Sequence, residues 1–234
     1  MQNNILILDE TTDNTDALTE WNGKEATVTL KRTLVADSWN TLAVPFNVDA
    51  TMLGYLKAQY GLSVKELTGS SLDGETLTLN FDDASSIEAG KPYLVKVTSA
   101  FDFSAQAFPG IEVSKEAVTV STTYADFIPT LGKTTIQDVS AADVLFVATG
   151  NTLKNPSTMP TDMKGFRAYF LLKNVPAGTR TFALNLGDKE TGITTTDFTD
   201  STDKAGAVYD LQGRKVNAAQ KGVYIQNGKK TVVK

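Results

Sequence analysis

The chain has 234 residues, enough for one large domain or two small ones, and ordinary shares of apolar (41%) and charged (21%) residues. It contains no histidine and no cysteine, which excludes Ser-His and Cys-His nucleophiles, thiol redox pairs, haem ligation through either residue and the usual zinc sites. Carboxylate acid–base chemistry, lysine chemistry and oxygen-ligated calcium remain open.

The net charge of −5 is unevenly distributed along the chain. Residues 207–234 carry six basic residues against Asp210 alone, a net +5, so residues 1–206 carry −10. An acidic body repels nucleic acid and anionic lipid, and we expect neither as a partner. No apolar stretch approaches the ~20 residues of a membrane span.

The opening segment is acidic, with one short apolar run at residues 5–8 and no basic residue before it. A signal peptide has a basic start and a longer apolar centre, so we expect none here, and an exported protein would have lost its own. We predict an acidic opening strand over residues 1–19. Its carboxylates lack the spacing of an EF-hand loop, so a solvated loop is favoured over a calcium site; they are Asp9, Glu10, Asp13 and Asp16.

Most of the following chain alternates apolar and polar residues, as half-buried strands do. The alternation recurs in EATVTL, WNTLAVPF, ETLTLNF, KPYLVKV and RTFALNL, with turn signals such as Asp73-Gly74 between them. Two segments, DVLFVA (143–148) and FRAYFLL (166–172), are apolar on both faces. They are predicted to be central strands between two layers.

One helix is predicted in DATMLGYLKAQYG, from a cap at Asp49 to a stop at Gly61. Residues 191–206 are polar, rich in Thr and Asp and without periodicity, which indicates a linker. We therefore predict an all-β protein. Residues 1–190 form an antiparallel β-sandwich body with one short helix, and residues 207–234 a short C-terminal β-meander.

The C-terminal segment contains two similar phrases, VYDLQGRKV and GVYIQNGKKTVVK. Each predicts a strand, a turn and a second strand, with Gln212-Gly213 and Asn227-Gly228 at the turns. Asn-Gly favours a two-residue type I′ hairpin, in which both turn residues have positive φ. Lysines beside the turns keep edge strands solvated. A charged β-meander that closes a fold is therefore one sufficient interpretation.

A second interpretation comes from a resemblance. The two phrases resemble the C-terminal sorting domain of proteins exported by the type IX secretion system of Bacteroidetes, with its pattern Y-x-L-x-G-[RK]-x-V, then G-[VL]-Y-[IL] and a lysine-rich last strand. The resemblance implies export, with the secretion machinery as a partner of the tail. The residues of this sorting-like motif are Tyr209, Leu211, Gly213, Val216, Gly222, Tyr224, Gly228, Lys229 and Lys230.

The body carries a looser resemblance. LKRTLVADSWNTLAVPF, SIEAGKPYLVKV and FRAYFLL resemble a terminal module of Bacteroides and Prevotella surface proteins, including leucine-rich-repeat adhesins. The resemblance implies a position outside the cell or at the outer-membrane surface. With histidine and cysteine absent, we expect a non-catalytic exported surface module for adhesion or scaffolding, without a cofactor. Its partner would be a surface glycan or a host or cell-surface protein.

The alternative function is a glycan-binding module of a polysaccharide-utilisation system, with Trp39 or Trp21 stacking on a sugar ring. For Trp39, burial under a helix or loop is favoured, because large indoles are usually well covered. A third hypothesis is a glycosidase that uses Asp82-Asp83 and Glu88 as its carboxylates. The turn context after a strand explains the same aspartates without any catalysis.

Two further residues or motifs complete the candidates. Arg167 lies inside the apolar segment FRAYFLL and is predicted to pair with a carboxylate of the body, since an unpaired buried guanidinium would be costly. Asp200-Ser201-Thr202 resembles a short O-glycosylation acceptor of Bacteroides proteins. That resemblance is a minor indication of export.

Overall fold

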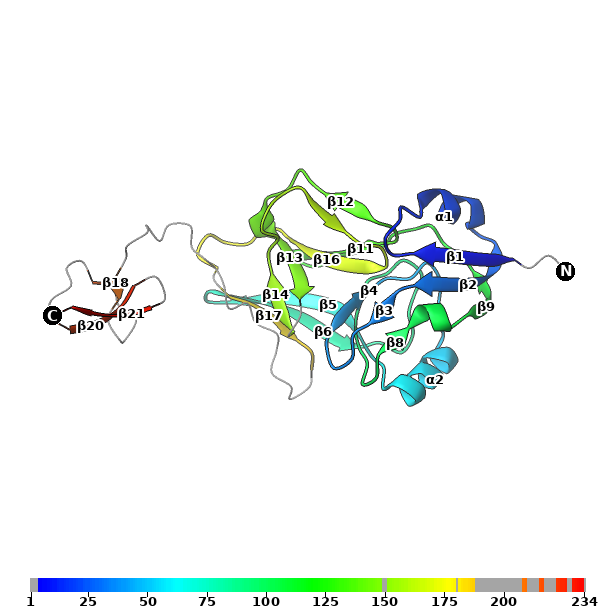
Figure 1. The fold of residues 1–234 in the computed structure, drawn as a ribbon, viewed down its shortest axis with the longest axis horizontal. Helices are drawn as coiled ribbons and strands as arrows, with labels where there is room; N and C mark the ends of the chain where they lie inside the picture. Colours follow the sequence, from blue (N-terminus) through cyan, green and yellow to red (C-terminus); the bar gives the residue numbers. More distant parts are fainter. Residues whose placement is uncertain are drawn as a thin grey trace. The chain divides into compact units, whose positions relative to one another are not determined.

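A computed structural model describes residues 4–148, 151–179 and 181–187, together with four short strands between residues 208 and 233. The chain divides into two compact units, Met1–Thr196 and Asp197–Lys234. Strands dominate both units, and Figure 1 shows how they are arranged in the first. The protein is all-β, as the alternating pattern predicts.

The central sheet of the first unit has five strands in the order β17-β6-β5-β7-β4. All pairs are antiparallel except β17 with β6. A two-residue connection at Gly74 joins the longest pair, β5 and β6, because Asp73 is paired with Thr76. The strands are β4 (Asn40–Leu42), β5 (Ser63–Asp73), β6 (Thr76–Asp83), β7 (Tyr93–Lys96) and β17 (Thr181–Asn185).

A second five-stranded sheet packs on one face of the central sheet and forms the predicted sandwich. Its order is β10-β11-β16-β13-β14, with every pair antiparallel. The core between the sheets is aromatic: Phe127 and Phe170 stack with centroids 4.4 Å apart, and the edge of Phe81 meets both rings. The strands are β10 (Val120–Ser121), β11 (Ala125–Thr130), β13 (Val144–Ala148), β14 (Thr152–Lys154) and β16 (Arg167–Leu172).

A third layer covers part of the other face of the central sheet. The largest sheet of this layer has the order β1-β2-β9. The first unit also contains two short strand pairs, β3–β8 and β12–β15. In β1–β2 the strands are parallel. The strands are β1 (Ile5–Asp9), β2 (Glu25–Lys31), β3 (Thr33–Leu34), β8 (Phe101–Asp102), β9 (Phe108–Glu112), β12 (Thr134–Ile136) and β15 (Thr161–Met163). Single 3-10 turns lie at Phe103–Ala105 and Ala141–Asp143.

These layers enclose β7 on both faces. Tyr93 and Val95 belong to the core cluster shared with β1 and β2, whereas Leu94 belongs to the sandwich core. The prediction of two-sided burial for 143–148 and 166–172 is only partly correct. In β16 one face is fully buried, but Tyr169 and its neighbours on the other face are half-buried. That outer face is covered locally, by contacts such as Tyr169 with Phe146, rather than by another sheet.

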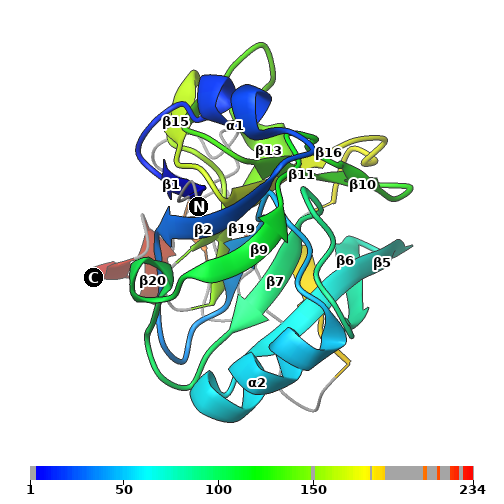
Figure 2. The same ribbon diagram turned by 90° about the vertical axis from the view of Figure 1, so that its right-hand side faces the viewer.

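The helix predicted after Asp49 is confirmed as α2 (Ala50–Tyr60). The Asp49 side chain accepts a hydrogen bond from the Met52 N–H, and Gly61 ends the helix with a left-handed φ of 59°. Buried leucines of α2 join the core cluster that contains β7, and Figure 2 shows the helix beside that strand. Neither helix of the described residues is long and apolar enough to cross a bilayer.

The prediction of an opening strand over residues 1–19 is wrong for the residues after Asp9. Only β1 is a strand, and a second helix, α1 (Thr15–Trp21), follows it. The chain reverses because the buried Asn14 side chain donates hydrogen bonds to the carbonyls of Asp9 and Leu131. Leu18 then packs in the core. The many Thr and Asp residues hide this short amphipathic turn in the sequence.

The second unit contains one antiparallel sheet in the order β19-β18-β20-β21. Pairing of Gln226 with Lys229 leaves two residues between β20 and β21, so the predicted two-residue hairpin at Asn227-Gly228 is confirmed in length. Three predicted features lie outside the described residues: the turn residues Asn227-Gly228, the turn at Gln212-Gly213 and the linker 191–206. The strands are β18 (Val208–Tyr209), β19 (Lys215–Val216), β20 (Gly222–Gln226) and β21 (Lys229–Val233).

We predict that Phe170→Ala lowers the free energy of unfolding by about 3–5 kcal/mol, because it removes one ring of the stacked pair and leaves a cavity in a fully buried site. Urea denaturation followed by tryptophan fluorescence measures the loss. Tyr55→Ala is the matched control, since Tyr55 is 48% exposed and its change should stay within about 0.5 kcal/mol. Equal effects of the two substitutions would contradict the assignment of this core.

Candidate functional site

The sorting-like motif lies on the strands of the second unit. Tyr209 is on β18, Val216 on β19, Gly222 and Tyr224 on β20, and Lys229 and Lys230 on β21. Leu211, Gly213 and Gly228 fall outside the described residues. Tyr209 is paired with Ile225, and Ile225 with Lys230. The two similar phrases therefore pair with each other in one sheet.

Neither tryptophan presents an open face to solvent. Trp39 is 8% exposed and belongs to the sandwich core, and its backbone N–H donates to Asn151 Oδ1 at 2.7 Å. Trp21 ends α1 and packs, half-buried, against the other core cluster. Trp21 lines none of the three pockets described for this part of the chain, so no pocket supports a binding role for it. A binding role for Trp39 stays a prediction, and it is restricted to the small part of the side chain that lines a pocket.

The acidic residues of the opening segment engage separate partners. Asp9 accepts hydrogen bonds from Thr11, which lower its carboxyl pKa, and pairs with Lys31 at 3.5 Å. Asp13 accepts hydrogen bonds from Thr15, which lower the pKa of that carboxyl in the same way. Asp16 lies in the first turn of α1. Within the described residues no group of three such ligands gathers that could hold a metal ion.

The aspartates considered for glycoside hydrolysis do not face a common cleft. Asp82 and Asp83 are neighbours on β6, and neighbours on a strand point to opposite faces. Asp83 pairs with Lys65 at 3.1 Å, and Glu88 pairs with Lys91 at 3.3 Å. Each of these two carboxylates therefore has a local ion-pair partner.

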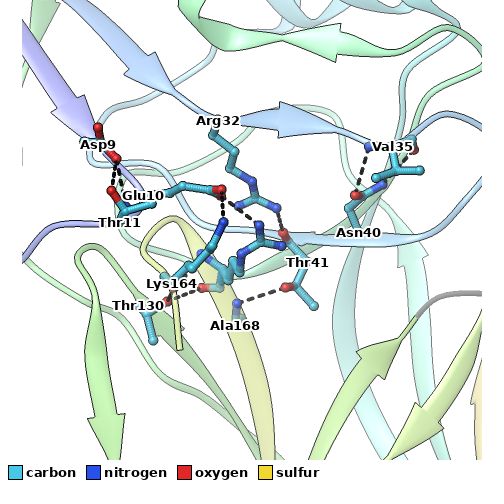
Figure 3. Close-up of polar contacts among 11 residues, drawn as sticks. Asp9, Glu10, Thr11, Arg32, Val35, Asn40, Thr41, Thr130, Lys164 and Ala168 are labelled. Carbon is cyan, nitrogen blue, oxygen red and sulfur yellow. Dashed lines mark hydrogen bonds and ion pairs between the residues drawn. The ribbon is translucent and has the colours of Figure 1, made fainter. Parts of the chain in front are cut away.

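Charged side chains do converge elsewhere, at the end of β1 and the start of β16. Glu10 Oε1 forms an ion pair with Lys164 Nζ at 2.8 Å, and Glu10 Oε2 forms one with Arg167 Nη2 at 2.7 Å. Arg32 lies beside Glu10 and Lys164 (Figure 3). We call Arg32, Lys164 and Arg167 the cationic cluster. The predicted pairing of Arg167 with a carboxylate of the body is confirmed. One carboxylate faces three cations.

Arg32 is the buried member of the cationic cluster. It follows Ala26, Val28 and Leu30 in the alternation of β2, so the same periodicity points it inward, where it is 3% exposed. One nitrogen, Nη2, donates to the carbonyl of Thr41, but Nε and Nη1 are buried without a hydrogen-bond partner. Burial lowers the pKa of Arg32 to about 9; repulsion by Arg167 adds to the shift and attraction by Glu10 opposes it.

Close backbone contacts fix the positions of these charges. The Gly165 N–H donates to the Glu10 carbonyl at 2.7 Å. A Cβ on Gly165 would lie 2.9 Å from the Cα of Gly132, and one on Gly132 would lie 2.7 Å from the Asn14 nitrogen. Only glycine permits three loops to meet so closely. This contact holds Glu10 within reach of β16.

The cationic cluster borders a pocket of about 350 Å³. Lys164 and Arg167 line one side, and Phe146 and Val147 of β13 contribute an apolar side. Trp39 also lines the pocket, although most of its ring is covered. This volume lies within the range of small-molecule sites, about 300–1,000 Å³. The pocket is therefore the candidate binding site of the body.

No known protein family, curated protein or solved structure matches this chain. The assignment of the site accordingly depends on geometry. Sequence reasoning considered Trp39 and Arg167 but missed Glu10 as the partner of Arg167, and it missed Arg32 and Lys164 altogether. The phase of the β2 alternation is a signal that could have indicated the inward position of Arg32. Lys164 has no comparable signal.

We predict that Glu10→Gln lowers the free energy of unfolding by at least about 2 kcal/mol. The cationic cluster then loses the one carboxylate that it contacts among the described residues, and three cations repel one another. Chemical denaturation at low ionic strength measures the loss. Glu20→Gln removes the same charge from an exposed position and serves as the control. A loss for Glu10→Gln no greater than that of the control would show that the carboxylate is not needed there.

Proposed function

We propose that this chain is a non-catalytic, exported surface module that serves adhesion or scaffolding. The observation that carries the proposal is the repeated tyrosine–glycine–lysine phrase, whose strands pair in their own sheet within a compact C-terminal unit. A basic segment with its own fold, following an acidic body, suits a sorting signal that separate machinery must recognise. On this proposal the protein belongs to the surface proteins of Bacteroidetes and acts outside the cell or at the outer-membrane surface.

The charged residues of the body support a binding role without catalysis. Glu10, Asp83 and Glu88 are engaged in ion pairs with neighbouring cations. The composition lacks histidine and cysteine, which supply most general bases and nucleophiles. A surface glycan or a cell-surface protein is the expected partner of such a module.

Deleting residues 207–234 tests the sorting role. Both chains are expressed with a cleavable signal peptide fused before residue 1, in a host that carries the type IX secretion machinery. We predict that the full chain reaches the cell surface and the truncated chain stays in the periplasm. The physical reason is that the body alone then lacks the strands that the machinery would recognise. Surface proteolysis and cell fractionation measure the distribution.

The control for this experiment is the fold of the truncated chain. Its resistance to protease and its thermal transition should match those of the body in the full chain, because the described ladders of β18–β21 are confined to their own sheet. Normal surface display of a folded, truncated chain would contradict a sorting role and leave the tail with a structural one.

A second candidate function, glycan binding, is favoured by the pocket at Trp39. A sugar presents an apolar C–H face and several hydroxyl groups, and the pocket combines aromatic and polar walls. The indole N–H of Trp39, a residue that lines the pocket, is a donor only. It can donate to a hydroxyl or ring oxygen.

We predict that the full chain retains sugars on a glycan array and that Trp39→Phe weakens binding about five-fold, because it removes one hydrogen bond while keeping most of the packing. Trp21→Phe is the matched control, since Trp21 does not line the pocket. Thermal denaturation verifies that both variants fold. Equal binding by the two variants, or no retention of any glycan, would contradict this candidate.

A further inference from the structure

The pocket carries a charge opposite to that of the body around it. Residues 1–206 sum to −10, yet the cationic cluster and Glu10 together sum to +2 at one side of the pocket. The other charged residue that lines the pocket, Asp162, is already paired with Lys133 at 3.0 Å and accepts from Thr135. A partly buried excess of positive charge is unfavourable unless an anion offsets it.

The hydrogen-bonding groups of this site are mostly donors. The Arg167 guanidinium donates to Glu10 Oε2 at 2.7 Å, and no second side-chain contact of this group is found among the described residues. The Lys164 ammonium likewise pairs only with Glu10 among the described residues, and the side chain is 53% exposed. Behind them, two buried nitrogens of Arg32 have no hydrogen-bond partner in the described part of the chain. Donors therefore dominate this side of the pocket, and a ligand that supplies several oxygens would pair with Lys164 and Arg167.

Two side-chain acceptors of the pocket are already engaged. The carboxylate of Asp162 is engaged as described, and the Asn40 side-chain oxygen accepts from the Val35 N–H. A peptide would bring main-chain N–H groups, which only donate, into a site that is already rich in donors. Sugar hydroxyls can accept as well as donate, and the half-buried ring of Phe146 offers an apolar face to a sugar ring.

We propose that this pocket binds a carboxylated sugar, a uronic acid unit, with its carboxylate held by Arg167 and Lys164. The carboxylate would lie beside the two exposed cations, and the ring would lie toward Phe146 and the Trp39 N–H. The buried charge of Arg32 raises the local positive potential without contact. This inference rests on the glycan-binding candidate and adds the chemical class of its ligand.

The test compares two sugars that differ at one carbon. Methyl glucuronide carries a carboxylate where methyl glucoside carries a hydroxymethyl group, and both are titrated into the full chain by calorimetry or NMR. We expect the glucuronide to bind at least about ten-fold more tightly, with an affinity near 1 mM for a single unit. High salt should remove most of the difference, since exposed charges are screened.

Lys164→Met is the diagnostic variant, because Lys164 is half exposed and its loss leaves Arg167 to pair with Glu10. It should weaken glucuronide binding about ten-fold and weaken glucoside binding far less, because only the glucuronide carries the carboxylate. Lys31→Met is the matched control: it makes the same charge change at an exposed residue that pairs with Asp9 and does not line the pocket. It should leave both affinities unchanged.

The remaining outcomes separate this inference from the function on which it rests. Equal affinity for glucoside and glucuronide would overturn the acidic ligand and keep glycan binding. Tighter binding of an oligoglutamate peptide than of the glucuronide would replace the sugar by an acidic peptide. Binding of neither sugar at up to roughly 10 mM, with no glycan retained on the array, would overturn both.

Discussion

The carboxylate of Glu10 connects the opening sheet to the sandwich. The two carboxylate oxygens accept hydrogen bonds from Lys164 and Arg167, and the backbone carbonyl of Glu10 accepts one from the Gly165 N–H. The pairing brings the end of β1 to the start of β16, and Arg32 lies next to it with two nitrogens unpartnered. Because like charges cluster there, the position of each depends on this one acid. The same contacts place two cations at the side of the pocket.

Apolar packing supplies the frame in which those charges are held. The central sheet separates two core clusters, so β7 is covered on both faces while the outer face of β16 is only half covered. Thr41 joins the layers: its hydroxyl accepts from the Ala168 N–H and its carbonyl accepts from Arg32. The pocket lies at the start of β16, where Arg167 and Ala168 line it together with residues of β4 and β13.

Charge is distributed at two scales in this protein. The acidic body and the basic tail differ over whole segments, which suits separate recognition of the tail by other molecules. The pocket reverses the sign of the body locally, over a few side chains from β2, β16 and the loop before β16. The proposed sorting function uses the first contrast, and the proposed acidic ligand uses the second. The two proposals can therefore hold or fail independently.

Local patterns in the sequence determined most of the elements, although not α1. Alternation predicts strands such as β2 and β6, Asp49 and Gly61 delimit α2, and Asn-Gly sets the length of the last hairpin. These features depend on backbone preference and periodicity over a few residues. Only the tertiary structure decided that β7 is enclosed, that Glu10 meets residues more than 150 positions away, and that Trp39 lines a pocket. Contacts between distant segments depend on how layers stack, and no local pattern encodes that arrangement.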